Sequence, residues 1–229
     1  MPPRPGHARL CTSRMERDLR ARGFRLIAGA DEAGRGALFG PVAAAAVILS
    51  PDRPVRGLDD SKQIEPEERE RLAVLIRERA IAWSVAAADA ATIDRINIYQ
   101  ASRLAMRRAV EQLTPAPDFL LTDAVPLDWR GPQRAVIHGD ALSRTIAAAS
   151  ILAKVYRDDV LRGWDQAFPG YGLARNKGYG TPDHLAALVA LGPAPLHRMS
   201  FEPVRSLARF PAASLQATLF EEPMAVACR

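Results

Sequence analysis

Residues 24–49 read FRLIAGADEAGRGALFGPVAAAAVIL. This stretch contains two short apolar segments, residues 24–30 and 41–49, and glycines and a proline lie between them. Turn-forming residues bound both segments, so the pattern predicts two adjacent strands joined by a turn. The four alanines at 43–46 individually favour helix, but glycine-proline before them and serine-proline after them leave too short a run.

Outward from this stretch, the pattern predicts helices that alternate with strands. A helix begins at Pro66, where proline and acidic residues suit the first turn. We expect, in chain order, that helix, a strand over 81–87, a helix over 97–113, strands over 119–122 and 134–137, and a helix opened by Thr181 and Pro182. A meander of three strands followed by alternating helices and strands predicts an α/β domain with a mixed sheet.

The longest periodic stretch predicts one long helix. Its apolar or small residues are spaced by three and four positions: Leu142, Ile146, Ala149, Ala153, Tyr156 and Val160. The small residues among them allow close packing against a sheet. We therefore expect one face of this helix to lie on the sheet.

Composition limits the class of protein. Hydrophobic residues make up 48% and charged residues 25% of the 229 residues, which excludes wholesale disorder. No apolar run approaches the roughly 18 residues of a membrane span, and no signal peptide is visible, so we expect a cytoplasmic protein. The two cysteines, Cys11 and Cys228, provide neither a disulfide framework nor a metal cluster. The net charge of +5 suits a polyanionic partner.

Three regions follow from local composition. Residues 1–12 are rich in proline and arginine and predict a flexible leader. Residues 13–209 predict the main domain, including a C-terminal helical segment. Residues 210–229 predict a loose tail. We expect a monomer.

Four acidic residues lie at or just after the ends of predicted strands: Asp31, Glu32, Asp123 and Asp140. If they converge at one sheet edge, their mutual repulsion requires a cation, and oxygen-only ligands select Mg²⁺ or Mn²⁺. Two such ions suit phosphodiester hydrolysis.

Each acid except the first pair also has a simpler interpretation. Asp140 is placed to cap the helix that begins near Leu142, and Asp123 suits an ordinary turn. The pair Asp59 and Asp60 lies in a polar loop and is interpreted as solvated or loop-closing.

The hexamer Asp31-Glu32-Ala33-Gly34-Arg35-Gly36, followed by Gly40-Pro41-Val42, resembles the signature of ribonuclease HII, the type 2 ribonucleases H. Further segments resemble the family in the same order, between about residues 19 and 204: Asp60-Ser61-Lys62, residues 97–106, residues 147–158 (AAASILAKVYRD), residues 176–181, and His197-Arg198 with Ser200-Phe201.

The resemblance implies a ribonuclease H-like fold, with a mixed five-stranded sheet flanked by helices and a C-terminal helical extension. It also implies that Asp31, Glu32, Asp123 and Asp140 are the catalytic, metal-binding acids, with two Mg²⁺ or Mn²⁺ ions during catalysis. One departure is Ala124, where the family usually has glycine after the third acid.

By the same resemblance, the main chain of Gly34, Arg35 and Gly36 reads the 2′-hydroxyl of a ribonucleotide, and Tyr179 stacks on the next deoxyribose. Phosphates need positive or neutral donors, and the candidates are Arg35, Ser61, Lys62, Lys177 and Arg198. Lys154 and Arg157 on the long helix are interpreted as a solvated face or a pair with Asp158. His197 is either an acid–base residue or structural.

In the tail, Gln216, Leu219 and Phe220 resemble the short peptides that dock on the bacterial sliding clamp. The resemblance to ribonuclease HII implies an endoribonuclease that nicks 5′ of ribonucleotides in duplex DNA and degrades the RNA strand of RNA/DNA hybrids, leaving 5′-phosphate and 3′-hydroxyl. The rivals are a module that binds hybrids without cutting, which would ignore EDTA, and a junction resolvase, which would not need a 2′-hydroxyl.

Overall fold

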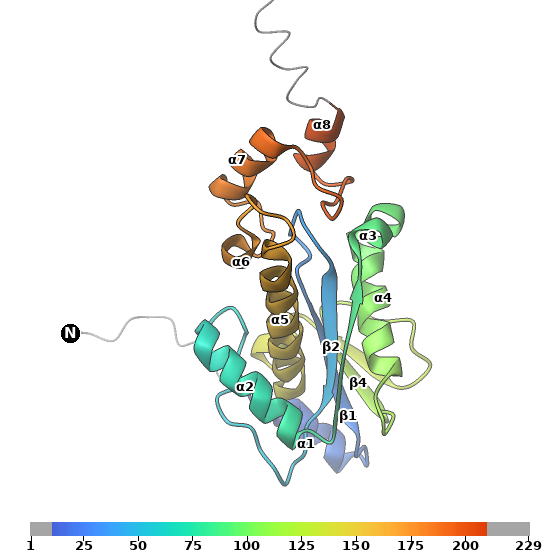
Figure 1. Ribbon diagram of the computed structural model, residues 1–229. Helices are drawn as coiled ribbons and strands as arrows, with labels where there is room; N and C mark the ends of the chain where they lie inside the picture. The colour runs from blue at the N-terminus through green and yellow to red at the C-terminus, as the bar shows by residue number, and fades with distance from the viewer. Residues whose placement is uncertain (1–10, 210–229) are drawn as a thin grey trace, which may run out of the picture. The chain divides into compact units, whose positions relative to one another are not determined.

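The computed structural model describes residues 11–209, which divide into two compact units (Figure 1). Residues 11–35 and 41–160 form the first, here called the sheet unit. Residues 36–40 and 161–209 form the second, here called the C-terminal unit. No helix among the described residues is long and apolar enough to cross a membrane.

The sheet unit is built on five strands in the order β3-β2-β1-β4-β5. The strands are β1 (Ile27–Ala33), β2 (Val42–Ile48), β3 (Ala82–Ala88), β4 (Phe119–Asp123) and β5 (Gln133–Val136). β2 runs antiparallel to both β1 and β3, while β4 is parallel to β1 and β5 is parallel to β4. This is the mixed five-stranded sheet that the sequence predicted.

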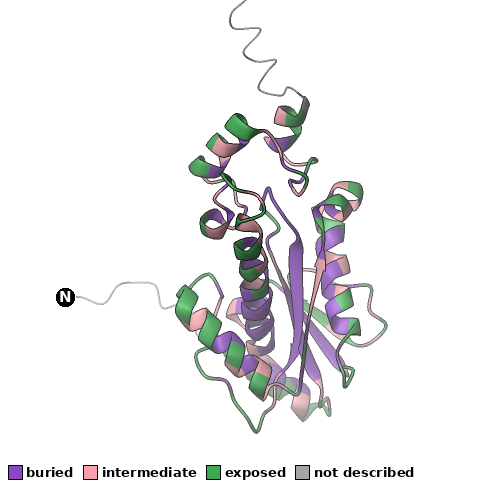
Figure 2. Cartoon of the chain, in the orientation of Figure 1, coloured by how far each residue is buried: buried purple, intermediate pink, exposed green. Residues whose placement is uncertain are grey.

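Helices cover both faces of this sheet (Figure 1). α3 (Ala90–Ile96) and α4 (Ile98–Glu111) lie on one face, and α4 contacts β1, β2 and β3. α2 (Pro66–Arg79) and α5 (Arg144–Asp165) lie on the other face, where they share a hydrophobic core with β2. In Figure 2 the strands β1, β2 and β4 and the first part of α5 are largely buried, while the outer side of α2 is exposed.

The alanine run in β2 explains how two helical layers approach a central strand so closely. Every residue of β2 is buried, and Ala43, Ala44, Ala45 and Ala46 have no exposed surface. Methyl side chains add little thickness, so the helices on each face can approach the backbone. The run is therefore a strand because of its place in the sheet, although alanine by itself favours helix.

α5 differs from its predicted pattern at its start and at Tyr156. It begins at Arg144, two residues after Leu142, and Tyr156 is exposed rather than buried. Its first part is buried nearly all round, from Ile146 to Ala153, because it packs on β1, β2 and α2 together. A helix with neighbours on several sides has no single apolar stripe, so periodicity alone gave the wrong face at Tyr156.

Two helices of the sheet unit were not predicted. α1 (Arg14–Ala21) packs Leu19 and Met15 against Phe119 and Ile146. Asp89 caps α3, because its side chain accepts a hydrogen bond from Thr92 N at 2.7 Å. Both helices are short, and the turn between α3 and α4 uses the left-handed Asn97, with φ of 66°.

The C-terminal unit contains α6 (Leu173–Asn176), α7 (Pro182–Leu191) and α8 (Val204–Arg209), and it also holds the last residues of α5. Thr181 caps α7 as predicted, because its hydroxyl accepts a hydrogen bond from His184 N at 3.4 Å. Residues 36–40 belong here because Phe39 packs in an aromatic group with Trp164, Phe168, Tyr171 and His197.

Candidate active site

Strand pairing places two of the acids side by side. β1 and β4 are parallel, and Ala30 pairs with Thr122 at the last step of their register. Asp31 and Asp123 each follow one of these partners, so both carboxylates lie at the same edge of the sheet. Their proximity appears in the charge coupling between them, which helps to raise the pKa of Asp31.

A backbone hydrogen bond brings in the fourth acid. Gly139 N donates to Asp123 Oδ1 at 2.7 Å, which fixes the start of the short helix η1 (Gly139–Ala141) next to the end of β4. Asp140 is the second residue of η1, and its own Oδ1 accepts a hydrogen bond from Ala141 N at 2.9 Å. The four acids, called the acid cluster below, therefore come from β1, β4 and η1.

Burial and mutual repulsion disturb the ionisation of this cluster. Burial raises the pKa of Asp31 well above its usual range, and the charges of Glu32 and Asp123 raise it further. Burial also raises the pKa of Glu32, although Arg35 Nη1 lies 3.0 Å from Glu32 Oε1 and opposes the shift. The pKa of Asp140 is likewise raised, by burial first and then by other carboxylates.

The chemistry of the cluster fits a divalent cation. All four side chains offer only oxygen donors, which suit Mg²⁺ or Mn²⁺. Glu32 Oε2 is buried with no hydrogen-bond partner within the described chain, so it has an unused acceptor. Across residues 11–209, no group of three or more His, Cys, Asp or Glu side chains is arranged to hold a metal ion as the side chains stand. The fit is therefore one of donor type.

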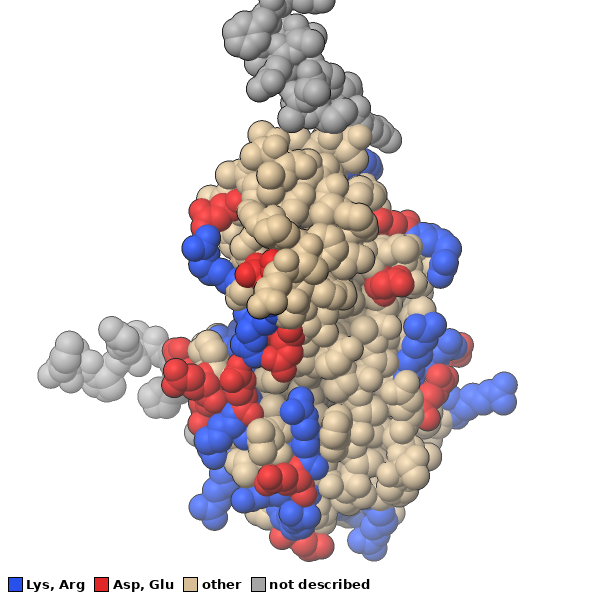
Figure 3. All heavy atoms as spheres, viewed as in Figure 1, with Lys and Arg blue, Asp and Glu red and all other residues tan. Residues whose placement is uncertain are grey.

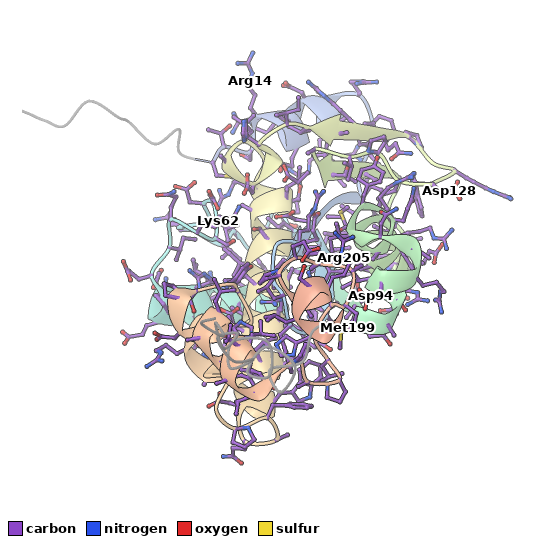
Figure 4. The ribbon with its side chains drawn as sticks, turned by 90° about the horizontal axis from the view of Figure 1, so that it is seen from above. Arg14, Lys62, Asp94, Asp128, Met199 and Arg205 are labelled. Carbon is purple, nitrogen blue, oxygen red and sulfur yellow. The ribbon has the colours of Figure 1, made fainter. Side chains whose placement is uncertain are left out.

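Lys62 is a second cation, after Arg35, that lies beside the acids. Its Nζ lies 3.9 Å from Asp140 Oδ2, and Figure 4 labels it on the loop between β2 and α2. Burial opposes its charged form, but the carboxylates of Asp60, Asp140 and Asp31 together raise its pKa above the usual value. Lys62 was predicted to hold phosphate, and this location is compatible with that role.

Sequence reasoning missed Ser150 as a site residue. A hydrogen bond from Ser150 favours the ionised form of Asp31, and Ser150 Oγ lies 2.9 Å from Ser61 Oγ. Both hydroxyls are buried, so they link α5 to the loop that carries Lys62. The sequence did contain a signal for Ser150, because the residue lies in the AAASILAK segment that resembles the family. That resemblance was not extended to Ser150 as a site residue.

The capping interpretation of Asp140 is wrong. α5 begins at Arg144, and Ser143 caps it, since Ser143 Oγ accepts a hydrogen bond from Ile146 N at 3.4 Å. Asp59 and Asp60 do close their loop, with Asp60 N donating to Asp59 Oδ1 and Lys62 N donating to Asp60 Oδ1. Asp60 also raises the pKa of Asp140, so it adds negative charge near the acid cluster.

Beyond β1, Gly34 is packed directly on Arg157. Gly34 has φ of 91°, and a Cβ atom there would overlap the Arg157 guanidinium. Arg157 is fully buried, and its Nε donates to the carbonyl oxygen of Pro41 at 3.1 Å. The prediction that Arg157 lies on a solvated face is therefore wrong. Its buried side chain packs against Gly34 instead. Lys154 instead pairs with Asp158, with 2.8 Å between Nζ and Oδ1.

Four of the predicted substrate residues belong to the C-terminal unit: Gly36, Lys177, Tyr179 and Arg198. Lys177 has φ of 53°, and its Nζ donates to Ala174 O at 2.5 Å. Arg198 is fully buried; its Nε donates to Gly40 O at 2.9 Å, and its guanidinium lies over the Phe201 ring. A buried arginine cannot meet a phosphate at the surface, so the expectation for Arg198 is corrected to a structural role.

His197 is a structural residue that connects to Tyr179. Its Nδ1 accepts a hydrogen bond from Ala194 N at 2.9 Å, and its Nε2 lies 3.2 Å from His184 Nε2. His184 Nδ1 lies 2.9 Å from Tyr179 O. With both rings neutral, His197 donates to His184 and His184 donates to Tyr179 O, which fixes the Tyr179 backbone. Burial lowers the pKa of His197 to about 4.

The tail residues Gln216, Leu219 and Phe220 lie outside the described residues. Ala124, the departure from the family pattern, adopts φ of 53°. This left-handed conformation explains physically why glycine suits the position after the third acid.

Comparison with known proteins adds independent information. Residues 28–204 match the family model described as ribonuclease HII. A curated ribonuclease HII from Solibacter usitatus (strain Ellin6076) is 67% identical over 201 residues, which cover 88% of each chain.

Two solved structures have a similar fold. Ribonuclease H2 from Pyrococcus horikoshii OT3 gives a TM-score of 0.68 at 24% identity, covering 81% of this chain and 98% of that one. RNase HII in the PCNA complex from Archaeoglobus fulgidus gives 0.64 at 25% identity, covering 78% and 96%. The chain therefore belongs to the ribonuclease HII family and is a ribonuclease H, a hydrolase that acts as an endonuclease.

Proposed function

We propose that this enzyme nicks duplex DNA on the 5′ side of an embedded ribonucleotide, and also degrades the RNA of RNA/DNA hybrids. The products carry a 5′-phosphate and a 3′-hydroxyl. The observation that carries this proposal is the convergence of the acid cluster at one edge of the sheet, where Asp123 accepts a hydrogen bond from the segment that bears Asp140.

Asp31, Glu32, Asp123 and Asp140 are the residues that would hold two Mg²⁺ or Mn²⁺ ions. Bound ions of this kind generate hydroxide, orient the phosphate and neutralise the leaving oxygen. Glu32 has a buried carboxylate oxygen with no hydrogen-bond partner within the described chain, and the hydrogen bond from Ser150 opposes the rise in the pKa of Asp31 that burial and the neighbouring carboxylates cause.

Substrate positioning is assigned to the residues around the acids. Lys62 lies beside Asp140 and is placed to hold a phosphate, with Ser61 as a neutral donor. Arg35 is a second phosphate candidate, and its pairing with Glu32 holds it close to the acid cluster. Lys177 remains a candidate in the C-terminal unit.

Recognition of the 2′-hydroxyl is assigned to the backbone of Gly34, Arg35 and Gly36, with Tyr179 stacking on the following deoxyribose. The 2′-hydroxyl is the group that distinguishes the two sugars, and glycine allows the backbone to approach it closely. If Tyr179→Ala and Gly36→Ala kept the wild-type preference for ribonucleotide-bearing over all-DNA duplexes, this assignment would be wrong.

The central experiment uses a duplex that carries one ribonucleotide, incubated with and without Mg²⁺ or Mn²⁺. We expect one nick, 5′ of the ribonucleotide, that disappears in EDTA. Asp31→Asn should abolish cleavage with binding largely retained. The matched control is Asp128→Asn, because Asp128 is an exposed acid on the loop after β4 (Figure 4).

The same assay separates the rival functions. Binding that ignores EDTA with no nick would indicate a module that only grips hybrids. Cleavage of branched all-DNA substrates without any 2′-hydroxyl would indicate a resolvase. Normal turnover by Asp31→Asn would remove Asp31 from the mechanism.

We also propose that Gln216, Leu219 and Phe220 tether the enzyme to a sliding clamp. Support comes from the likeness of this segment to clamp-binding peptides and from the Archaeoglobus fulgidus relative, which was solved in complex with PCNA. The double variant Gln216→Ala and Phe220→Ala should weaken binding to the purified clamp and leave cleavage unchanged. Unchanged clamp affinity would contradict the tether.

A further inference from the structure

Seven arginines line two neighbouring hollows of the sheet unit. The first hollow, of about 280 Å³, is lined by Arg17, Arg20 and Arg144, among other residues. The second, of about 600 Å³, is lined by Arg53, Arg56, Arg71 and Arg79, together with Asp52. Pro54 lines both hollows, and the seven side chains are called the arginine surface below.

The loop between the two hollows is held in place from both sides. Arg79 Nη1 donates to Pro54 O at 3.1 Å, and Arg144 Nη2 donates to Val55 O. Val55 itself is buried in the core between α2 and α5. The loop that carries Pro54 and Val55 is therefore held in place, and the arginines on either side of it lie around a fixed segment of backbone.

The charge of this surface is largely uncompensated. Among residues 11–209, Arg71 is the one member that forms an ion pair, with Glu68. Some arginines elsewhere do pair with acids, as Arg107 does with Glu111 and Asp128. Figure 3 shows basic side chains gathered around the lower end of α2, with acidic side chains of α2 beside them.

The acidic side chain that lines the first hollow already accepts hydrogen bonds from other parts of the protein. Glu16 is 2% exposed, and its Oε1 accepts hydrogen bonds from Ser143 Oγ at 2.7 Å and from Thr145 N at 3.0 Å. It therefore fixes α1 to the start of α5. It leaves Arg17 and Arg20 free of an ion pair within the described chain.

The arginine surface begins next to the acid cluster. Arg144 is four residues from Asp140, and Arg56 precedes the Asp60–Lys62 loop on the same chain segment. Cys11 lies where these groups meet, since Glu16, Asp59, Arg144 and Asp140 all act on it; burial is the main cause that raises its pKa to about 12. A long ligand that binds at the acid cluster would therefore extend over the arginine surface.

We propose that the arginine surface binds the phosphate backbone of the duplex that flanks the cleaved site. This inference rests on the proposed function. Guanidinium groups match phosphate oxygens with two parallel hydrogen bonds, and phosphate contacts carry no sequence information. Such contacts suit an enzyme that must act on a ribonucleotide in any sequence.

The test compares two triple variants that each remove three exposed arginines. Arg17→Gln with Arg53→Gln and Arg56→Gln alters the arginine surface. Arg95→Gln with Arg108→Gln and Arg130→Gln is the matched control, on α3, α4 and the loop after β4. Fluorescence anisotropy in EDTA measures binding to duplexes of about 12 and about 30 base pairs, each with one central ribonucleotide, over a series of KCl concentrations.

We expect the arginine-surface variant to bind the longer duplex about tenfold more weakly, with the slope of log K against log[KCl] reduced by about 2 to 3. We expect changes of less than about twofold in its affinity for the short duplex and in its maximal cleavage rate with Mg²⁺. The control variant should bind both duplexes within about twofold of the wild type. An unchanged slope on the longer duplex would overturn the proposal, and equal losses on both duplexes would overturn the assignment to flanking DNA. Failure of the wild-type enzyme to nick either duplex would instead overturn the proposed function.

Discussion

Gly29 of β1 lies directly against the backbone of Thr145 in α5. A Cβ atom at position 29 would overlap the carbonyl carbon of Thr145 and the amide nitrogen of Ile146. These are backbone atoms of a buried helix, so they cannot move aside as a flexible side chain could. The strand that carries Asp31 and the helix that carries Ser150 therefore depend on the absence of a side chain at one position.

Gly29→Ala should lower the free energy of unfolding by about 3 kcal/mol or more, because the added methyl forces α5 away from β1. Urea unfolding measures this change. Gly163→Ala is the matched control: Gly163 is an exposed residue of α5, and a Cβ there meets nothing within 4 Å. The control should raise stability by about 0.5–1 kcal/mol through helix propensity. Equal effects of the two variants would contradict the close packing.

Gly34→Ala should lower both stability and cleavage, because the new methyl would overlap the buried guanidinium of Arg157. Gly23→Ala separates this clash from backbone strain. Gly23 also has a positive φ, of 99°, but has open space around its Cβ position. We expect Gly23→Ala to cost only about 1 kcal/mol of stability and no activity. Wild-type cleavage by Gly34→Ala would show that the packing of Gly34 on Arg157 does not matter for the site.

Ala124→Gly should stabilise the protein by up to about 1 kcal/mol, because Ala124 adopts a left-handed conformation that is strained for a residue with a Cβ. Thermal or urea unfolding provides the measurement. Ala91→Gly, at an exposed position in α3, should have the opposite sign and destabilise by about 1 kcal/mol. A loss of stability in Ala124→Gly would count against the positive φ at this position.

The buried pair His184 and His197 should make stability depend on pH. Burial lowers the pKa of His197 from 6.5 to about 4, so between these values the unfolded chain binds a proton that the folded chain excludes. The stability contribution is therefore complete above pH 6.5 and decreases as the pH falls toward 4, by up to about 3 kcal/mol. The pKa of His184 is lowered too, in the same direction.

Urea unfolding at several pH values between 7 and 4.5 checks this dependence. The slope should decrease in His197→Gln and persist in His138→Asn, since His138 is an exposed histidine and asparagine tolerates its left-handed backbone. Identical slopes in the wild type and His197→Gln would contradict the assignment.

Local features of the sequence were enough to predict most strands and helices of the sheet unit. Alternation between apolar segments and turn residues gave β1 and β2, and Pro66 and Thr181 marked true helix starts. Their places near strand ends singled out the four acids, and the family resemblance then implied a metal-binding role for them. These signals succeed because turns, caps and strand-forming segments depend mainly on neighbours along the chain.

Other features depend on residues distant in sequence. Arg157 and Arg198 looked like surface cations, but each is fully buried and donates to a backbone carbonyl more than a hundred residues away. Tyr156 fitted the apolar spacing of α5 and is nevertheless exposed, because the neighbours of α5 change along its length.

The sequence by itself determined which residue types were available for chemistry: a pair of adjacent acids, two further acids near strand ends, and flexible glycines next to the first pair. The tertiary structure alone decided which strand lies beside which and therefore which acids meet. The hydrogen bond from Gly139 N to Asp123 Oδ1 joins segments 16 residues apart, and β4 pairs with β1 across about 90 residues. The physical reason is that burial and strand pairing belong to the whole packed sheet, whereas propensity belongs to each residue.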